Sequence, residues 1–160
     1  MTLEILELRS LKAIGAEMAA LAVEARNEGH LFVQRLCEDW KSGANRFDAP
    51  GEILMGGYVA QRLVAVGGLN RDPYQAADGT GRLRHVYVCA DVRRLGVGTC
   101  LVEYIKGVAE KRFSVLRLRT MTAEAASFYE HIGFRKTGAA DATHRIDFRE
   151  RSVSTPSVIA

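Results

Sequence analysis

The sequence has few cysteines, no long apolar run and little net charge, and each shortage excludes a class of protein. Its 160 residues include three cysteines and no CxxC pair, so we expect reduced thiols and neither a disulfide framework nor a zinc site. No apolar stretch approaches membrane-spanning length, and acids stand near the start where a secretion signal needs bases. A net charge of +3 is small for a nucleic-acid-binding protein. We therefore expect a cytoplasmic globular protein that binds neither membrane nor nucleic acid.

Hydrophobic periodicity predicts a mixture of strands and helices. A weak strand over residues 3–9 precedes two helices, over 11–29 and 33–43. Strands follow at 53–58, 63–69 and 83–88, with a hairpin turn at 60–62 and a loop at 70–81. A helix from 97, a strand at 115–120, a helix after Thr122 and a strand pair at 134–137 and 143–148 complete the pattern. This order predicts an α/β protein of the α+β mixed-sheet kind, with helices on both faces. We expect one domain over 1–149 and a loosely attached tail over 150–160.

A short basic loop with two glycines stands between the strand at 83–88 and the helix from 97. It reads Arg93-Arg94-Leu95-Gly96-Val97-Gly98. Glycine lets a backbone approach a phosphate closely, and a helix N-terminus adds partial positive charge. No Gly-Lys-Ser/Thr follows, so this is not a Walker loop, and the third glycine of a dinucleotide-binding fingerprint is missing. The loop indicates a phosphate site, with an ordinary turn as the alternative.

Three segments together resemble the GCN5-related N-acetyltransferase (GNAT) family. They are the strand residues 86–88, the loop Arg93-x-x-Gly96-x-Gly98, and the stretch Ala125-x-x-Phe128-Tyr129-Glu130-x-x-Gly133-Phe134. The resemblance covers most of the chain and is strongest over residues 83–136. It implies the family's three-layer fold, with a mostly antiparallel sheet and a central parallel pair. It also implies an acyltransferase that moves an acetyl group from acetyl-CoA to a primary amine of a small molecule or peptide, by direct attack in a ternary complex and without a metal.

The resemblance further implies where acetyl-CoA would bind. The backbone of residues 86–88 would pair with the pantetheine arm, and the amides of 94–99 would hold the pyrophosphate. An N–H near Val88 would polarise the thioester carbonyl. Thr122 stands where the family often has an asparagine that contacts the cofactor, so the helix cap is kept and the amide is lost. The expected cofactor-binding residues are Val86, Tyr87, Val88, Arg93, Arg94, Leu95, Gly96, Val97, Gly98, Thr99 and Thr122.

Tyr129 and His85 are the catalytic residues that we expect. The resemblance places Tyr129 near the thioester sulfur as the general acid. Because tyrosine titrates near ~10 and a thiol near ~8.5, Tyr129 would act mainly as a hydrogen-bond donor to the departing thiolate. Arg117 occupies the position of a glutamate that serves some members as base. His85 is therefore the candidate base, and the alternatives are a water chain, Asp91, Asp72, Glu52 and His30.

Two alternatives to this function and mechanism stay open. The chain could be a non-catalytic acyl-CoA-binding regulatory module, which the missing glutamate and asparagine favour and the presence of Tyr129 disfavours. A covalent acetyl group on Cys89 or Cys100 is the lesser alternative for an enzyme, since Cys100 falls on a helix and is expected to pack as a small hydrophobe.

The acceptor is the partner that the sequence describes least. Arg71, Arg82 and Arg84 favour an amine that also bears a carboxylate or a phosphate. The strand after residue 143 is expected at the sheet edge, where it and the tail could support a homodimer.

Overall fold

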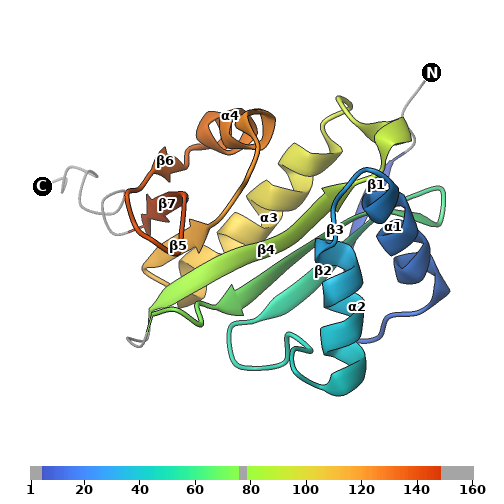
Figure 1. The fold of residues 1–160 in the computed structure, drawn as a ribbon, viewed down its shortest axis with the longest axis horizontal. Helices are drawn as coiled ribbons and strands as arrows, with labels where there is room; N and C mark the ends of the chain where they lie inside the picture. The colour runs from blue at the N-terminus through green and yellow to red at the C-terminus, as the bar shows by residue number, and fades with distance from the viewer. Residues whose placement is uncertain (1–4, 76–78, 149–160) are drawn as a thin grey trace, which may run out of the picture.

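The computed structural model describes residues 5–75 and 79–148, and a seven-stranded sheet runs through its middle (Figure 1). The strand order is β1-β2-β3-β4-β5-β7-β6. In chain order the elements are β1 (Leu6–Ser10), α1 (Ala16–Asn27), α2 (Phe32–Ser42), β2 (Ile53–Val59), β3 (Arg62–Arg71), β4 (Thr80–Val88), the 3-10 turn Ala90–Val92, α3 (Val97–Arg112), β5 (Val115–Leu118), α4 (Ala123–Ile132), β6 (Arg135–Lys136) and β7 (His144–Asp147). The pair β4 and β5, joined through α3, is parallel, and the other described pairs are antiparallel. The predicted mixed sheet is confirmed.

Helices cover both faces of the sheet. In Figure 1, α1 and α2 lie in front of it and α3 lies behind β4. Two adjacent glycines of β3 mark the two interfaces, because successive strand residues point to opposite faces. A Cβ on Gly67 would lie 2.8 Å from Ile105 of α3, and one on Gly68 would lie 2.5 Å from the ring of Phe47 on the other face. Both layers therefore approach the sheet too closely for a methyl group.

The strand β4 carries a bulge at His85. Val66 pairs with Tyr87 and Gly68 pairs with Arg84, so one residue of β3 faces two residues of β4. His85 has a φ of +58°, in the left-handed region, and a bulge of this kind bends a strand and increases its twist. The bend occurs just beyond the last residue of β4 that pairs with β5. The bulge therefore changes the direction of the last residues of β4 relative to β5.

Several predicted boundaries differ from the structure. The first helix begins at Ala16, because Leu11 still donates its N–H to Leu54 O (2.8 Å) and so continues the pairing with β2. The strands β3 and β4 extend into the predicted loop at 70–81. The strand predicted at the edge, β7, lies between β5 and β6, because β6 folds back on it. The expected tail at 150–160 lies outside the described residues. None of the described helices is long and apolar enough to cross a membrane.

Candidate active site

The strands β4 and β5 separate after a short parallel contact, which leaves a gap in the middle of the sheet. Three residue pairs join them, and the last is Arg82 with Arg117. Beyond this point β4 continues to Val88 beside β3, while β5 pairs with β7 on its other side. Over residues 86–88, one edge of β4 therefore has no neighbouring strand in the described part of the chain. Such an edge offers backbone N–H and C=O groups to an extended ligand.

The predicted phosphate loop follows this edge directly. Gly96 precedes the first residue of α3 and has a φ of +85°, and Arg94 also lies in the left-handed region at +66°. No side chain caps this helix, so the N–H groups of its first turn lack a side-chain acceptor. The side chains of Arg94 and Leu95 are exposed. With the helix dipole added, the start of α3 can attract an anion.

Arg93 connects this loop to β4 and to the end of α1, although its side chain is exposed. Its Nε donates to the Val88 carbonyl at 2.9 Å, and both terminal nitrogens donate to the carboxylate of Glu28 at the end of α1, one of them at 2.8 Å. These bonds, with a further one from the Tyr87 hydroxyl, lower the pKa of Glu28 to about 2. The Arg93 guanidinium is thus bonded to protein groups, and its visible role is to fix the loop against β4 and α1.

The helix α4 has the ends that the sequence predicted. Thr122 accepts a hydrogen bond from Ala125 N at 3.1 Å, and Gly133 ends the helix with a φ of +117°. The threonine cap and the C-terminal glycine are confirmed. The helix lies beside the start of α3, since a Cβ on Gly98 would lie 3.4 Å from the ring of Phe128.

Tyr129 points into the interior from this helix. It is 9% exposed, and its ring packs edge-on against Phe128 and Phe134, with centroids 5.0 and 5.8 Å away. Burial raises the pKa of its hydroxyl, so the group stays protonated near neutral pH. Its hydroxyl has no hydrogen-bond partner among residues 5–75 and 79–148. It is therefore a free donor.

His85 lies beneath α2. Its Nδ1 is 2.9 Å from the carbonyl oxygen of Phe32, so Nδ1 carries the proton and donates it. The Nε2 atom is enclosed and has no partner among the described residues. Burial, and then the nearby charges of Arg84 and Arg35, lower the pKa of His85 to about 4. The ring is neutral at pH 7, and its free lone pair faces the protein interior.

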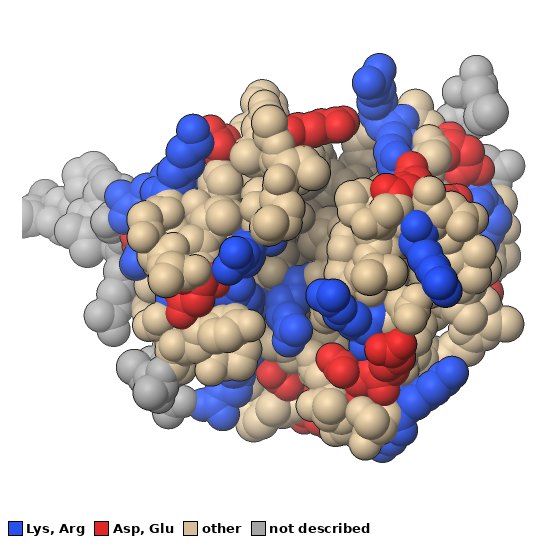
Figure 2. Space-filling view, in the orientation of Figure 1, with Lys and Arg blue, Asp and Glu red and all other residues tan. Residues whose placement is uncertain are grey.

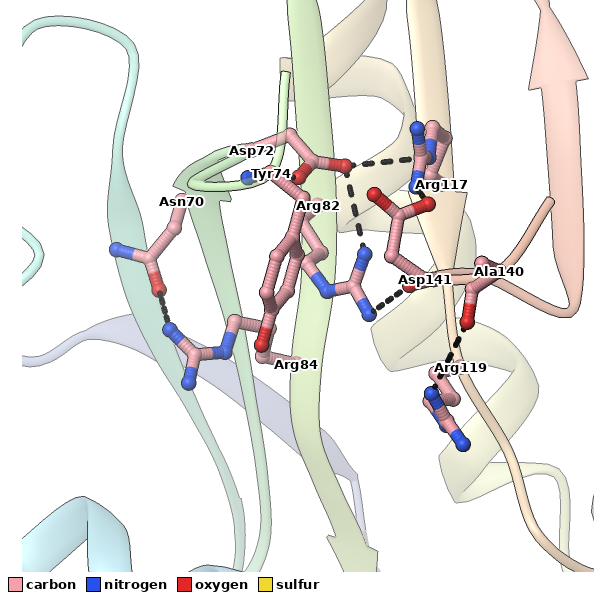
Figure 3. A network of polar contacts seen from close by, with 9 residues as sticks. All are labelled: Asn70, Asp72, Tyr74, Arg82, Arg84, Arg117, Arg119, Ala140 and Asp141. Atoms are coloured by element: carbon pink, nitrogen blue, oxygen red, sulfur yellow. Dashed lines mark hydrogen bonds and ion pairs between the residues drawn. The ribbon is translucent and has the colours of Figure 1, made fainter. Parts of the chain in front are cut away.

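Arg117, where the sequence resemblance led us to expect a glutamate, belongs to a buried ionic network (Figure 3). Its Nε lies 3.2 Å from Asp72 Oδ2, and it also pairs with Asp141. Arg82 lies 3.4 Å from the same Asp72 oxygen and donates to the Asp141 carbonyl oxygen at 2.7 Å. The side chain of Asp72 is fully enclosed. This network joins β4 and β5 at the point where they begin to separate.

Three of the other residues considered as bases or nucleophiles, Asp91, Glu52 and Cys89, have protein partners or are buried. Asp91 pairs with Arg62, and Glu52 accepts from Asn70 and from two backbone amides. Cys89 is buried, and burial raises the pKa of its thiol to about 11, so it is a poor nucleophile. Cys100 is exposed. Residues 5–75 and 79–148 contain no group of three or more metal-ligating side chains.

The fold brings most of the predicted site together. The open edge at 86–88 leads into the loop at 93–99, and α4 places Phe128, the neighbour of Tyr129, next to Gly98 near the end of that loop. Sequence reasoning missed the network around Asp72 and the contact of Glu28 with Arg93. The alternation of leucine and arginine over residues 116–119 was the one available signal that arginines share a face. Nothing in the sequence showed that a loop aspartate would be enclosed against it.

Comparison with known proteins agrees with this geometry. The family model for the acetyltransferase (GNAT) domain matches residues 55–136, about half of the chain. A solved structure described as an acetyltransferase, from Exiguobacterium sp. 255-15, is 27% identical and aligns with a TM-score of 0.82 over 94% of this chain and 99% of that one. No curated protein matches significantly.

More distant structures share the fold. A GNAT-family acetyltransferase from Staphylococcus aureus MU50 is 15% identical, with a TM-score of 0.67 over 89% of this chain and 99% of that one. The glucosamine-6-phosphate N-acetyltransferase of Arabidopsis thaliana is also 15% identical, with a TM-score of 0.59 over 85% and 95%. With the family match, the divided parallel pair and the uncapped start of α3, these findings identify the chain as an acyltransferase that belongs to the GNAT acetyltransferase family.

Proposed function

We propose that the protein is an N-acetyltransferase that moves an acetyl group from acetyl-CoA to a primary amine by direct attack in a ternary complex. The observation that carries the proposal is the continuity of the open β4 edge with the uncapped start of α3. An extended arm and a pyrophosphate, joined in one ligand, would meet these two features in that order.

The residues present fit this ligand. The backbone of residues 86–88 would pair with the pantetheine arm, and the amides of residues 94–99 would bind the pyrophosphate. Acetyl-CoA supplies the activated acyl group as a thioester. Arg93 keeps the loop in place through Glu28 and Val88. Thr122 would act through its cap, because its hydroxyl already accepts from Ala125.

Tyr129 would donate a hydrogen bond to the sulfur as negative charge develops there. Its hydroxyl is protonated and without a partner in the described part of the chain. Full proton transfer is unfavourable, because even an ordinary tyrosine pKa exceeds that of a thiol by about 1.5 units, or roughly 2 kcal/mol. The burial that raises the Tyr129 pKa increases this difference. Hydrogen bonding is therefore the role that its chemistry supports.

The proton of the attacking amine would leave to solvent. His85 was the expected base, but a pKa of about 4 makes it a weak one, and catalytic bases work best with a pKa near the working pH. Its free nitrogen is also enclosed. We propose that His85 positions α2 against β4 through Phe32.

The test is chromatographic measurement of CoA and acetylated amine after incubation of the protein with acetyl-CoA and a panel of primary amines. A thiol reagent is unsuitable because Cys100 is exposed. The proposal predicts equal amounts of both products. Acetyl-CoA binding without turnover of any amine contradicts it and favours the regulatory module.

Tyr129→Phe gives a second test. Loss of the donor should lower kcat by roughly 10- to 100-fold with little change in the KM for acetyl-CoA. Tyr104→Phe is the matched control, since Tyr104 lies exposed on α3. Equal activity of both variants argues against a role for the Tyr129 hydroxyl.

A further inference from the structure

We infer that the acceptor is an amine that also carries a carboxylate or phosphate, and that Arg84 and Arg119 bind this anion from the two sides of the gap between β4 and β5. The inference rests on the proposed function and names its substrate class. It starts from four arginines, three in the neighbouring strands β4 and β5 and the fourth, Arg119, directly after β5. Carboxylates of the protein neutralise two of these arginines and not the other two.

Three of the four arginines point to the same face of the sheet, and the fourth lies beside them. Arg82 pairs in register with Arg117 across β4 and β5, and parallel partners share a face. Arg84 lies two residues further along β4, where alternation returns the side chain to that face. Arg119 follows the last residue of β5, and its contact with Ala140, the neighbour of Asp141, places its side chain beside the same network. The shared face is the one covered by α1 and α2, because Gly68, the pairing partner of Arg84, faces Phe47 there.

The inner pair, Arg82 and Arg117, is already neutralised. Their side chains are each 6% exposed, and Asp72 and Asp141 provide two carboxylates for the two guanidiniums. The expectation that Arg82 binds an acceptor is therefore not supported by its contacts.

The outer pair, Arg84 and Arg119, has only neutral partners. Arg84 Nη1 lies 3.5 Å from Asn70 Oδ1, and Arg119 Nη1 lies 3.4 Å from Ala140 O. Both contacts are at the long limit for a hydrogen bond. Neither arginine has a carboxylate within ion-pair distance in residues 5–75 and 79–148. Among the residues drawn in Figure 3, the carboxylates of Asp72 and Asp141 contact Arg82 and Arg117 only. The next carboxylate, Glu52, bonds to Asn70 and lies beyond it from Arg84.

Both outer arginines are accessible from the same side. Arg84 is half-buried and Arg119 is exposed. Arg35, exposed on α2, adds a third charge close enough to act on His85 together with Arg84. Figure 2 shows that this face is hollowed between the α4 side and the α2 side, and that basic side chains line the hollow.

An anion is the ligand that satisfies such groups. A guanidinium presents parallel N–H donors that match the two oxygens of a carboxylate or phosphate. A partly enclosed position strengthens the attraction relative to open water. A neutral amine gains nothing from these charges. An acceptor with an anionic group beside its amine would be anchored by Arg84 on β4 and by Arg119 just beyond the end of β5, on the two sides of the gap.

The experiment compares amines in pairs that differ in the anion. The pairs are O-phosphoethanolamine with ethanolamine, and glycine and glutamate with their amides, each tested for acetylation and for direct binding by calorimetry in the presence of CoA. We expect the anionic member of at least one pair to be preferred about tenfold or more in kcat/KM and in affinity. Comparison of the phosphate pair with the carboxylate pairs shows which of the two anions the site prefers.

Variants assign the preference to residues. Arg84→Gln and Arg119→Gln should each lower kcat/KM for the anionic member of a pair much more than for its neutral partner, and Arg84→Lys should restore part of the preference. Arg26→Gln, at an exposed site on α1, is the control. Circular dichroism checks that the variants fold. Arg119→Gln is expected to disturb the fold less than Arg84→Gln, because Arg119 is exposed and Arg84 is half-buried.

Two failures can be told apart. If neutral and anionic members are acetylated and bound equally, or if both Gln variants keep the preference, the inference is wrong and acetyl transfer stands. If no amine is acetylated, the proposed function fails, and calorimetry still decides whether the arginines bind the anion. Absence of preferential binding in that case overturns the inference as well.

Discussion

Replacing Asp72 with asparagine should strongly destabilise the protein. The change keeps the size of the side chain. It also keeps an oxygen that can accept the hydrogen bond from Tyr74 N, which lies 2.9 Å from Asp72 Oδ1 in the wild type. It removes the negative charge that lies 3.4 Å from Arg82 and 3.2 Å from Arg117. Two guanidiniums, each 6% exposed, would then share only Asp141, which is 30% exposed. Removing one partner from a buried ionic group costs about 3–5 kcal/mol, a large part of the stability of a domain of this size.

Urea unfolding, followed by circular dichroism, measures this free energy. Asp91→Asn is the matched control, because the Asp91–Arg62 pair has side chains 62% and 53% exposed. Loss of such a pair is expected to cost less than about 1 kcal/mol. If Asp72→Asn unfolds within about 1 kcal/mol of the wild type at an unchanged slope, the buried network does not stabilise the junction of β4 and β5.

Three further changes test other parts of the site. Thr122→Ala should lower the free energy of unfolding by about 1 kcal/mol, since Ala125 N loses its acceptor. His85→Asn should reduce the acid sensitivity of the protein. The folded pKa of about 4 lies below the ordinary 6.5, so the unfolded chain binds a proton that the folded protein excludes, and stability falls by up to about 3 kcal/mol as the pH drops from 6.5 to 4. Glu28→Gln should raise the KM for acetyl-CoA several-fold through a looser loop, with kcat less affected.

Each of these has an outcome that contradicts it. If the urea midpoint of Thr122→Ala equals that of the wild type, the hydrogen bond from Ala125 N to Thr122 does not stabilise the protein. Stability curves of equal slope between pH 4 and 6.5 for His85→Asn and the wild type would show that another group causes the acid effect. For Glu28→Gln, the control is Glu38→Gln at an exposed position on α2, and an equal KM in both variants would disconnect Glu28 from cofactor binding.

Local rules predicted much of this fold from sequence. The hairpin predicted at 60–62 is present, and its turn is one residue shorter: it consists of Ala60 and Gln61, both with positive φ, and Arg62 begins β3. The cap at Thr122 and the glycine at the end of α4 were readable for the same reason, because each depends on neighbouring residues.

The bulge at His85 was not readable. Left-handed backbone is usually marked by glycine, and here a histidine adopts it. The register of β4 is set by the whole sheet and by the contact of His85 with Phe32, more than fifty residues earlier in the chain.

The charges were misread for a related reason. Arg82 and Arg84 look alike in sequence, but Asp72 and Asp141 neutralise the first and not the second. These partners come from loops, so they have no periodic relation to the strands. Which arginine is left for a ligand follows only from the tertiary structure.

A crystal structure with bound CoA tests the central claim most directly. The account predicts the pyrophosphate at the amides of residues 94–99, the pantetheine arm along residues 86–88 in the gap between β4 and β5, and the sulfur within hydrogen-bond reach of the Tyr129 hydroxyl. CoA bound elsewhere, or a sulfur more than about one water molecule from Tyr129, would contradict it.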